Sequence, residues 1–289
     1  MFTYVVLHYM STEMTVECVN HMLRLGEDSN IVIVDNCSPN GSGEQLLSIY
    51  NENPRVHVII NSKNEGFARG NNLGYTYAKE SLDSDYIVVS NNDVIISQED
   101  FEQSISSFFV NHNVDVCGPD IITPDGFHQN PLCVNTLSTK KLKKVIFLNK
   151  VKLLMFSIPF LFNMYAKYRK RNKVIVGSLD KPVDMVDCVL HGSFIVFSRK
   201  YFLKEPYAFL PVTYMYGEEF IMYDYWRYNG YKTGVCSSAQ ILHLGGKSTT
   251  QQWGDIAKTK FRFRHMTDSL IVLLKLRNQY INDGIYFKE

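Results

Sequence analysis

Short, largely apolar runs alternate with stretches of helical periodicity through the first part of the chain. The runs are rich in β-branched residues and lie at 2–7, 31–34, 56–60 and 86–89. Runs of this length are typical of buried strands in a parallel sheet. Helical spacing of apolar residues at 15–25 separates the first two runs, and further helices are expected at 44–50 and up to Lys79. This order predicts βαβ units and an α/β fold with a mainly parallel central sheet flanked by helices.

The alternation continues through a second half. Helices are expected at 99–111 and from Glu218 to Asn229, and strands at 114–119, after Ser193 and at 231–235. We expect a glycine-containing loop at 241–248 and a long helix with an apolar centre at 258–280. The predicted organisation is a domain of residues 1–250, with 1–95 as its nucleotide-binding half, followed by a helical tail at 251–289.

Residues 139–173 differ in composition from the rest of the chain. They contain eleven Lys or Arg residues and no Asp or Glu. Within them, 153–166 is an uncharged apolar run of 14 residues broken by Pro159. A spanning helix needs ~20 apolar residues, so this run is too short to cross a bilayer. We predict a basic insert whose amphipathic segments lie in the interface of an anionic membrane. The alternative is an ordinary surface hairpin with a basic face.

Composition narrows the function classes. Hydrophobic residues make up 45% of the 289 and charged residues 20%, which fits a globular chain with a large core. The net charge of +1 gives no general attraction for nucleic acid, so no nucleic-acid partner is expected. The six cysteines form no CxxC pair, so neither a zinc site nor a disulfide framework is indicated. A strand begins at the N-terminus without a signal peptide, and we expect a cytoplasmic protein.

Polar side chains follow three of the predicted strands. Ligands bind just beyond the carboxyl ends of parallel strands, so these positions are candidate site residues. The Asp35 carboxylate can accept the N–H of uracil or thymine, or it can cap its own loop. Residues 64–71 offer backbone N–H groups near a helix start, which suits phosphate or ribose. Asp93, after Asn91 and Asn92, can hold a divalent cation that in turn holds a diphosphate, although an Asn/Asp turn is the simpler explanation.

Six motifs in this order resemble those of the family 2 inverting glycosyltransferases of the GT-A fold, especially the bacterial cell-surface polysaccharide and rhamnosyltransferase-like type. The motifs are Asp35-Asn36-Cys37-Ser38, Asn64-Glu65-Gly66-Phe67, Asn91-Asn92-Asp93, His191-Gly192-Ser193, Glu218-Glu219 and the loop from His243 to Ser248. The resemblance covers most of the chain except the basic insert. Two positions depart from the pattern, since Asn91 replaces the first acidic residue of Asp-x-Asp and Glu219 replaces an Asp.

The resemblance implies inverting transfer of a sugar from a UDP- or dTDP-sugar to a glycan, with a lipid-linked saccharide as acceptor. This would occur in surface polysaccharide synthesis, on the inner face of the cell membrane. It implies Glu219 as general base, with Glu218 as the fallback. Mn²⁺ or Mg²⁺ would be held by Asp93 and His243, the acceptor by His191 and Gly192. The implied donor-binding residues are His8, Tyr9, Asp35, Asn64, Gly66, Gly70, Asn71, Asn91 and Asn92.

Other readings of these residues remain open. A sugar nucleotidyltransferase would need a glycine-rich basic loop after the first strand, and residues 8–11 contain neither glycine nor a basic residue. A non-catalytic partner that keeps a donor site would accommodate Asn91 and Glu219, and it would bind donor without turnover. The carboxylates of Glu218 and Glu219 are favoured at a helix start by the helix dipole alone. Aromatic side chains could stack on sugars or simply pack, namely Tyr214, Tyr216, Trp226 and Trp253.

Overall fold

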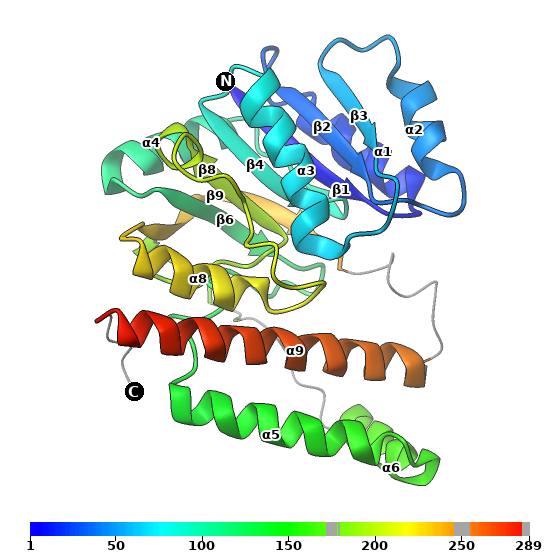
Figure 1. The fold of residues 1–289 in the computed structure, drawn as a ribbon. Coiled ribbons are helices and arrows are strands. Elements are labelled where there is room, and N and C mark those ends of the chain that lie inside the picture. Colours follow the sequence, from blue (N-terminus) through cyan, green and yellow to red (C-terminus); the bar gives the residue numbers. More distant parts are fainter. Residues whose placement is uncertain (172–177, 179, 246–254, 285–289) are drawn as a thin grey trace.

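The computed structural model describes residues 1–171, 178, 180–245 and 255–284, and its centre is one mixed β-sheet (Figure 1). The strands are β1 (Phe2–His8), β2 (Asn30–Asp35), β3 (Val56–Ile60), β4 (Tyr86–Asn91), β5 (Val94–Ile95), β6 (Val116–Ile122), β7 (Met185–Val186), β8 (Phe194–Ser198) and β9 (Thr233–His243). Their order is β3-β2-β1-β4-β8-β6-β9-β5, and β7 also pairs with β9.

Most of the helices cover the two faces of this sheet, and the others form layers outside it (Figure 1). They are α1 (Thr12–Met22), α2 (Ser42–Tyr50), α3 (Gly66–Ser81), α4 (Phe101–His112), α5 (Thr139–Met155), α6 (Pro159–Arg171), α7 (Arg199–Phe202), α8 (Glu218–Tyr228) and α9 (Asp255–Asn282). Alternation along β1 separates two cores, because Tyr4 and Val6 pack with α1, α2 and α4, whereas Val5 packs with α3, α7 and α8.

The expected α/β fold with flanking helices is confirmed, but the sheet is wholly parallel only across β1 to β4, because the second half contains the parallel pair of β6 and β9 together with antiparallel pairs. Strands β1 to β4 are mutually parallel, as the strand–helix alternation predicts. Beyond them β8 runs antiparallel to both β4 and β6. Residues 1–95 therefore follow the expected strand–helix pattern, and the second half adds strands of both directions.

Strand β9 corrects one prediction. Residues 231–235 were expected as a strand and 241–248 as a loop, whereas β9 runs from Thr233 to His243. The register between β6 and β9 shifts between Pro119 and Asp120, opposite the polar pair Ser237-Ser238. This polar interruption makes one long strand look like a short strand followed by a loop in the sequence. As a result, His243 lies at the end of a strand and pairs with Val94 of β5. Residues 246–248 of the expected loop lie outside the described part.

The basic insert and the C-terminal tail pack on one another. Helix α9 lies between α8 and α5, so that α5 and α6 form an outer layer away from the sheet (Figure 1). Leu142 and Ile146 of α5 are buried with Leu270 and Leu273 of α9 and with Ile221 of α8. No described helix has the length and apolarity that crossing a membrane requires.

Candidate active site

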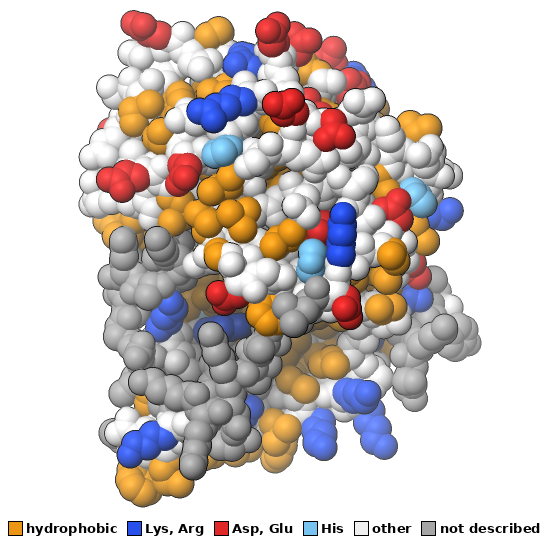
Figure 2. Space-filling model, turned by 180° about the vertical axis from the view of Figure 1, so that it is seen from behind, with side chains coloured by type: hydrophobic (Ala, Val, Ile, Leu, Met, Phe, Trp, Pro, Cys, Tyr) orange, Lys and Arg blue, Asp and Glu red, His pale blue; other side chains and the backbone are white. Residues whose placement is uncertain are grey.

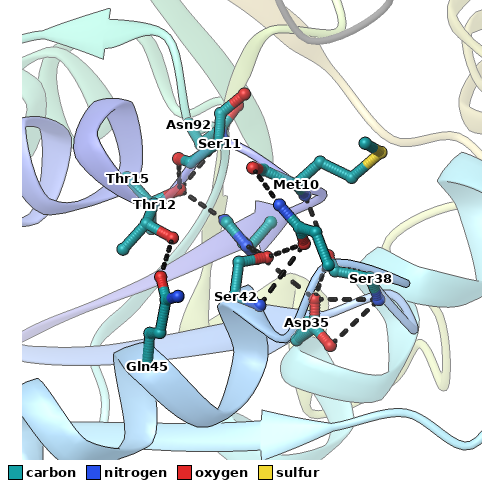
Figure 3. A network of polar contacts seen from close by, with 11 residues as sticks. Met10, Ser11, Thr12, Thr15, Asp35, Ser38, Ser42, Gln45 and Asn92 are labelled. Atoms are coloured by element: carbon teal, nitrogen blue, oxygen red, sulfur yellow. Dashed lines mark hydrogen bonds and ion pairs between the residues drawn. The ribbon is translucent and has the colours of Figure 1, made fainter. Parts of the chain in front are cut away.

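The carboxyl ends of β1, β2 and β4 bring the first group of candidate residues to one edge of the sheet. The parallel registers place His8 beside Asp35 and Leu7 beside Asn91. Asp35 is 2% exposed and accepts hydrogen bonds from the backbone N–H and hydroxyl of Ser38 (Figure 3). A Cβ on Gly43 would lie 2.5 Å from Asp35 Oδ2, so only glycine leaves room for this carboxylate. The loop-capping role of Asp35 is present, and it fixes the carboxylate at the end of β2.

His8 lies beneath these loops. It is fully buried, with Nδ1 2.7 Å from Thr15 Oγ1 and Nε2 2.8 Å from Ser42 Oγ. Burial lowers the pKa of His8 to about 4 although Asp35 opposes the shift, so the ring is neutral. Asn92 donates to the same Thr15 hydroxyl at 2.9 Å, which links the ends of β1 and β4 through α1 (Figure 3). His8 and Asn92, predicted to bind the donor, are therefore buried beneath the candidate site, where their side chains can position its loops.

Asn36 organises the loop that enters α3. Its side-chain amide donates to Asn64 Oδ1 at 3.1 Å and to the Gly66 carbonyl at 3.0 Å. Gly66 has φ +81°, and a Cβ there would lie 2.1 Å from the Tyr214 carbonyl oxygen, so glycine is required. Sequence reasoning placed Asn36 in a motif without giving it a role, and its contacts supply one.

The remaining candidate residues near this loop divide into interior residues of α3 and accessible residues outside it. Gly70 packs against Leu7 and Asn36, and Asn71 is fully buried with its amide donating to the Phe67 carbonyl at 3.0 Å. Tyr9 and Asn64 keep part of their surface exposed. Gly70 and Asn71 thus shape the loop, whereas Tyr9 and Asn64 can meet a ligand directly.

Asp93 and His243 converge from β4 and β9. His243 Nε2 lies 3.3 Å from Asp93 Oδ1, and the Leu244 N–H donates to the Asp93 carbonyl at 2.9 Å. The other ring nitrogen of His243, Nδ1, is 2.7 Å from Gln129 Oε1, which can only accept. Both ring nitrogens therefore face acceptor oxygens, and a neutral imidazole has one proton to offer them.

A divalent cation between Nε2 and Oδ1 fits this arrangement. Imidazole and carboxylate are both ligands for Mn²⁺, and a second acceptor on Nδ1 fixes the tautomer that leaves Nε2 for a metal. Among the described residues no three His, Cys, Asp or Glu side chains form a metal cluster, so the protein would supply two ligands of these types. Gln129 was not predicted, because nothing in its loop forms a recognisable motif.

His191 lies beside this pair. Its ring centroid is 5.5 Å from that of His243, and its Nδ1 is 2.9 Å from Ser193 Oγ. The His191 N–H donates to Asn130 Oδ1 at 2.9 Å. Burial, with a smaller contribution from His243, lowers the pKa of His191 to about 4, so this ring is also neutral.

The two glutamates stand at the start of α8. Glu218 is buried and accepts from the Thr213 hydroxyl at 2.9 Å, and burial together with the Glu219 charge raises the pKa of Glu218 to about 7. Glu219 is only half-buried, and the backbone N–H groups of Gly192 and Gly217 lie near its carboxylate, where they oppose the effect of burial on its pKa. Burial raises the pKa of Glu219 as well, which makes it a stronger base than a solvated carboxylate.

Of the candidate aromatic residues, Tyr214 and Tyr216 lie beside this carboxylate pair in the sequence. The Tyr214 hydroxyl donates to Asn64 Oδ1 at 3.2 Å, which joins the carboxylate side to the loop at the start of α3. Of the two alternatives for Trp226, packing is the one observed, because it is buried in the core and donates to the Tyr201 hydroxyl at 3.0 Å. Trp253 lies outside the described residues.

This fold and arrangement define a GT-A glycosyltransferase, with polar loops at the strand ends and a carboxylate pair facing them from α8. The family model of glycosyl transferase family 2 matches residues 3–204. The chain belongs to this family.

Two curated relatives match parts of the chain. The dTDP-rhamnosyl transferase RfbF of Shigella flexneri is 31% identical over 103 residues, which is 36% of this chain and 33% of that protein. The low-salt glycan biosynthesis hexosyltransferase Agl10 of Haloferax volcanii is 27% identical over 126 residues, 44% of this chain and 38% of that protein. The chain thus spans well under half the length of the curated relatives it matches.

Solved structures agree on the fold. GalNAc-T7, crystallised with UDP, GalNAc and Mn²⁺, gives a TM-score of 0.60 over 97% of this chain and 49% of that one, at 12% identity. S. aureus TarS residues 1–349 in complex with UDP gives 0.50 over 99% of this chain and 75% of that one, at 13% identity. Similarity at these identities supports the fold alone.

Proposed function

We propose that this glycosyltransferase moves a sugar from a UDP- or dTDP-sugar to a glycan acceptor with inversion at the anomeric carbon. The observation that carries the proposal is the placement of Glu219. Its half-buried carboxylate lies near the backbone N–H groups of Gly192 and Gly217, and the neighbouring His191 ring is 5.5 Å from the His243 ring of the Asp93–His243 pair. A single accessible base opposite a leaving-group site is what inverting transfer requires.

The proposed reaction is a direct displacement. The acceptor hydroxyl oxygen attacks the anomeric carbon on the face opposite the nucleoside diphosphate. The new C–O bond forms as the bond to the phosphate oxygen breaks, and the electron pair leaves with the diphosphate. The hydroxyl proton passes to the Glu219 carboxylate, whose pKa is raised by burial. Glu218, with a pKa raised to about 7, is partly protonated near neutral pH and limits repulsion within the pair.

A divalent cation is proposed at Asp93 and His243. Bound there with donor oxygens and water, Mn²⁺ or Mg²⁺ would stabilise the negative charge that develops on the leaving diphosphate. Asn91 supplies no charge at the first position of this motif. We therefore expect the protein to hold the cation weakly until the donor arrives.

The nucleotide is proposed to lie over Asp35, with Tyr9 and Asn64 beside it. These residues stand at the ends of β1 and β2 and in the loop before α3, and the last two are partly exposed. The names of the relatives support the donor class, since one is a dTDP-rhamnosyl transferase and one solved structure is a complex with UDP.

Donor hydrolysis tests the activity. The protein is incubated with a panel of UDP-, dTDP- and GDP-sugars and Mn²⁺, Mg²⁺ or EDTA, and released nucleoside diphosphate is measured. We expect slow release from one UDP- or dTDP-sugar, abolished by Asp93→Ala. Nucleotide binding by calorimetry without release from any donor, even with glycan acceptors, would instead favour a non-catalytic partner.

We also propose that the hairpin of α5 and α6 lies on the inner face of the membrane that carries a lipid-linked acceptor. Its outer surface exposes large apolar side chains, namely Phe147, Leu148, Val151, Leu154, Met155, Ile158, Phe160 and Met164. Lysines accompany them at 140, 141, 143, 144, 150, 152 and 167. Figure 2 shows Lys or Arg and hydrophobic side chains together on the lower part of the molecule, where this hairpin lies. Apolar anchors flanked by cations favour an anionic lipid surface.

Vesicle flotation tests this docking. We expect the protein to float with phosphatidylglycerol-containing vesicles and to lose at least most of that binding in Phe147→Ser/Leu154→Ser, which removes side chains 66% and 74% exposed. Val110→Ser is the matched control, because this α4 residue is 77% exposed but lies outside the hairpin. Equal flotation of all three proteins would refute the docking surface without bearing on catalysis.

A further inference from the structure

The first half of α9 touches both the carboxylate pair's turn and the membrane-side hairpin. We call residues 213–217, which precede Glu218, the catalytic turn. The His265 ring centroid is 5.1 Å from that of Tyr214, and that of Phe261 is 6.5 Å from that of Tyr216. On the hairpin side, the Phe263 centroid is 5.3 Å from that of Phe156. One helix, ~10–12 Å across, therefore separates the hairpin from the catalytic turn.

The catalytic turn is held in a constrained shape under α9. Tyr216 has φ +70° and Gly217 φ +89°, two successive left-handed residues. A left-handed non-glycine residue is uncommon and persists where its surroundings enforce it, often at functional sites. A Cβ on Gly217 would lie 3.3 Å from Met266 Sδ and from Ser269 Cβ, so α9 packs directly on the turn. The Tyr216 ring is thereby fixed two residues before Glu218.

Arg262 adds a cation at this ring. Its guanidinium carbon lies 5.9 Å from the Tyr216 ring centroid, within cation–π range, and the side chain is exposed. Burial raises the pKa of Tyr216. The charge of Arg262 opposes this shift and the charge of Glu218 adds to it, so both side chains are close to the Tyr216 ring. A guanidinium that faces a ring keeps its N–H groups in its own plane, where they can bind phosphate in pairs.

We propose that Arg262 is an acceptor-recognition residue that binds the phosphate group joining a lipid-linked acceptor to its lipid. The proposal rests on the function proposed above. If the lipid is bound at the hairpin, its sugar must extend past α9 to reach Glu219. The phosphate that links lipid and sugar would then lie beside α9, between the hairpin and Glu219. The first half of α9 carries the positive charge that phosphate binding needs, since residues 258–264 contain two Lys and two Arg and no acidic residue. Tyr216 and α9 hold Arg262 on the catalytic side of that path.

Two probes of equal chain length test this proposal with the full-length protein. Farnesyl diphosphate carries the anion and farnesol lacks it, and their dissociation constants are measured by calorimetry in neutral micelles. We expect the wild-type protein to bind farnesyl diphosphate at least about tenfold more tightly than farnesol. Arg262→Gln should remove most of this preference. Arg264→Gln should retain it, because that exposed cation is about 200° away around the helix.

The remaining outcomes separate this proposal from the others. Equal losses in the two variants, or no preference in the wild type, would overturn it. A parallel loss of UDP affinity in Arg262→Gln would assign the residue to the donor diphosphate and overturn it too. A matching loss of flotation with phosphatidylglycerol vesicles would assign it to membrane head groups. Failure of the proposed function appears differently, as binding of neither UDP nor dTDP by the wild-type protein.

Discussion

Asp35, Asp93 and Glu219 are each held at the edge of the sheet by a different kind of neighbour. Ser38 caps Asp35, His243 lies 3.3 Å from Asp93, and the backbone N–H groups of Gly192 and Gly217 lie near Glu219. Gly43 and Gly192 leave space for two of these carboxylates, since a Cβ on either would lie within 2.7 Å of a carboxylate oxygen. The geometry of the site thus depends on small residues as much as on charged ones.

Gly192→Ala should displace the proposed base without removing it. The added Cβ would lie 2.7 Å from Glu219 Oε1, and Gly192 is outside the left-handed region, so this contact is the source of strain. A shift of ~1 Å in a reacting group lowers the rate by up to about 100-fold. We expect kcat to fall by about 10- to 100-fold with the donor dissociation constant unchanged, measured by steady-state kinetics and calorimetry. Unchanged kcat would show that Glu219 is not the base.

Glu218 should make stability depend on pH. Burial raises its pKa from 4.5 to about 7, so the folded state holds this proton more tightly than the unfolded chain does. The free energy of unfolding should therefore fall as pH rises from about 4.5 to about 7. Glu218→Gln lacks this titrating group. Between pH 5 and pH 8 we expect its free energy of unfolding to fall less than that of the wild type, by on the order of 1–3 kcal/mol. Urea denaturation at both pH values measures this, and identical pH dependence in the two proteins would contradict it.

At the scale of elements, a buried ion pair joins α8, α9 and the segment that precedes the basic insert. Arg277 Nε donates to Asp224 Oδ2 at 2.7 Å, and Arg277 Nη2 donates to Thr136 Oγ1 at 2.8 Å. Both charged side chains are fully buried. Asp224, one and a half turns beyond Glu219, is occupied by these contacts, since it also accepts from the Thr136 hydroxyl at 3.0 Å. The pair fixes the helix that carries the proposed base.

Arg277→Met should destabilise the protein strongly. It leaves the buried Asp224 carboxylate without its cation, a change that typically lowers the free energy of unfolding by about 3–5 kcal/mol. Arg277→Met/Asp224→Leu should recover much of that loss, because a buried pair replaced by apolar groups is often near neutral. Guanidinium denaturation of both variants measures the difference. A single variant within about 1 kcal/mol of wild type would contradict the assigned role.

The first-half elements could be predicted because each is specified locally. A short, β-branched apolar run such as 31–34 predicts a strand from its own residues. Asp35 and Asp93 could be chosen as candidates because each follows the end of such a strand. Strand β8 could not be placed, because its antiparallel position between β4 and β6 depends on distant pairing. Gln129 was missed for the same reason, since only the fold brings it to His243.

At the scale of the whole molecule, the structure arranges its parts in sequence from sheet edge to hairpin. The strand ends carry the nucleotide-side residues, α8 carries the carboxylate pair, and α9 separates α8 from α5 and α6 (Figure 1). The sequence indicated a basic insert but not its partner, because Leu270 and Leu273 lie more than 100 residues from Leu142. The proposed donor site, the proposed base and the proposed membrane-binding hairpin therefore follow one another from the sheet edge to the outer helices.

Comparison of Glu219→Gln with Glu218→Gln tests directly whether Glu219 is the general base. Donor affinity and the rate of nucleoside diphosphate release are measured for both variants and the wild type with the active UDP- or dTDP-sugar. We predict that Glu219→Gln keeps the donor affinity and loses at least about 100-fold in rate, because it lacks the base. Glu218→Gln should lose less, because its carboxylate is buried against Thr213. Full activity in Glu219→Gln would contradict the account.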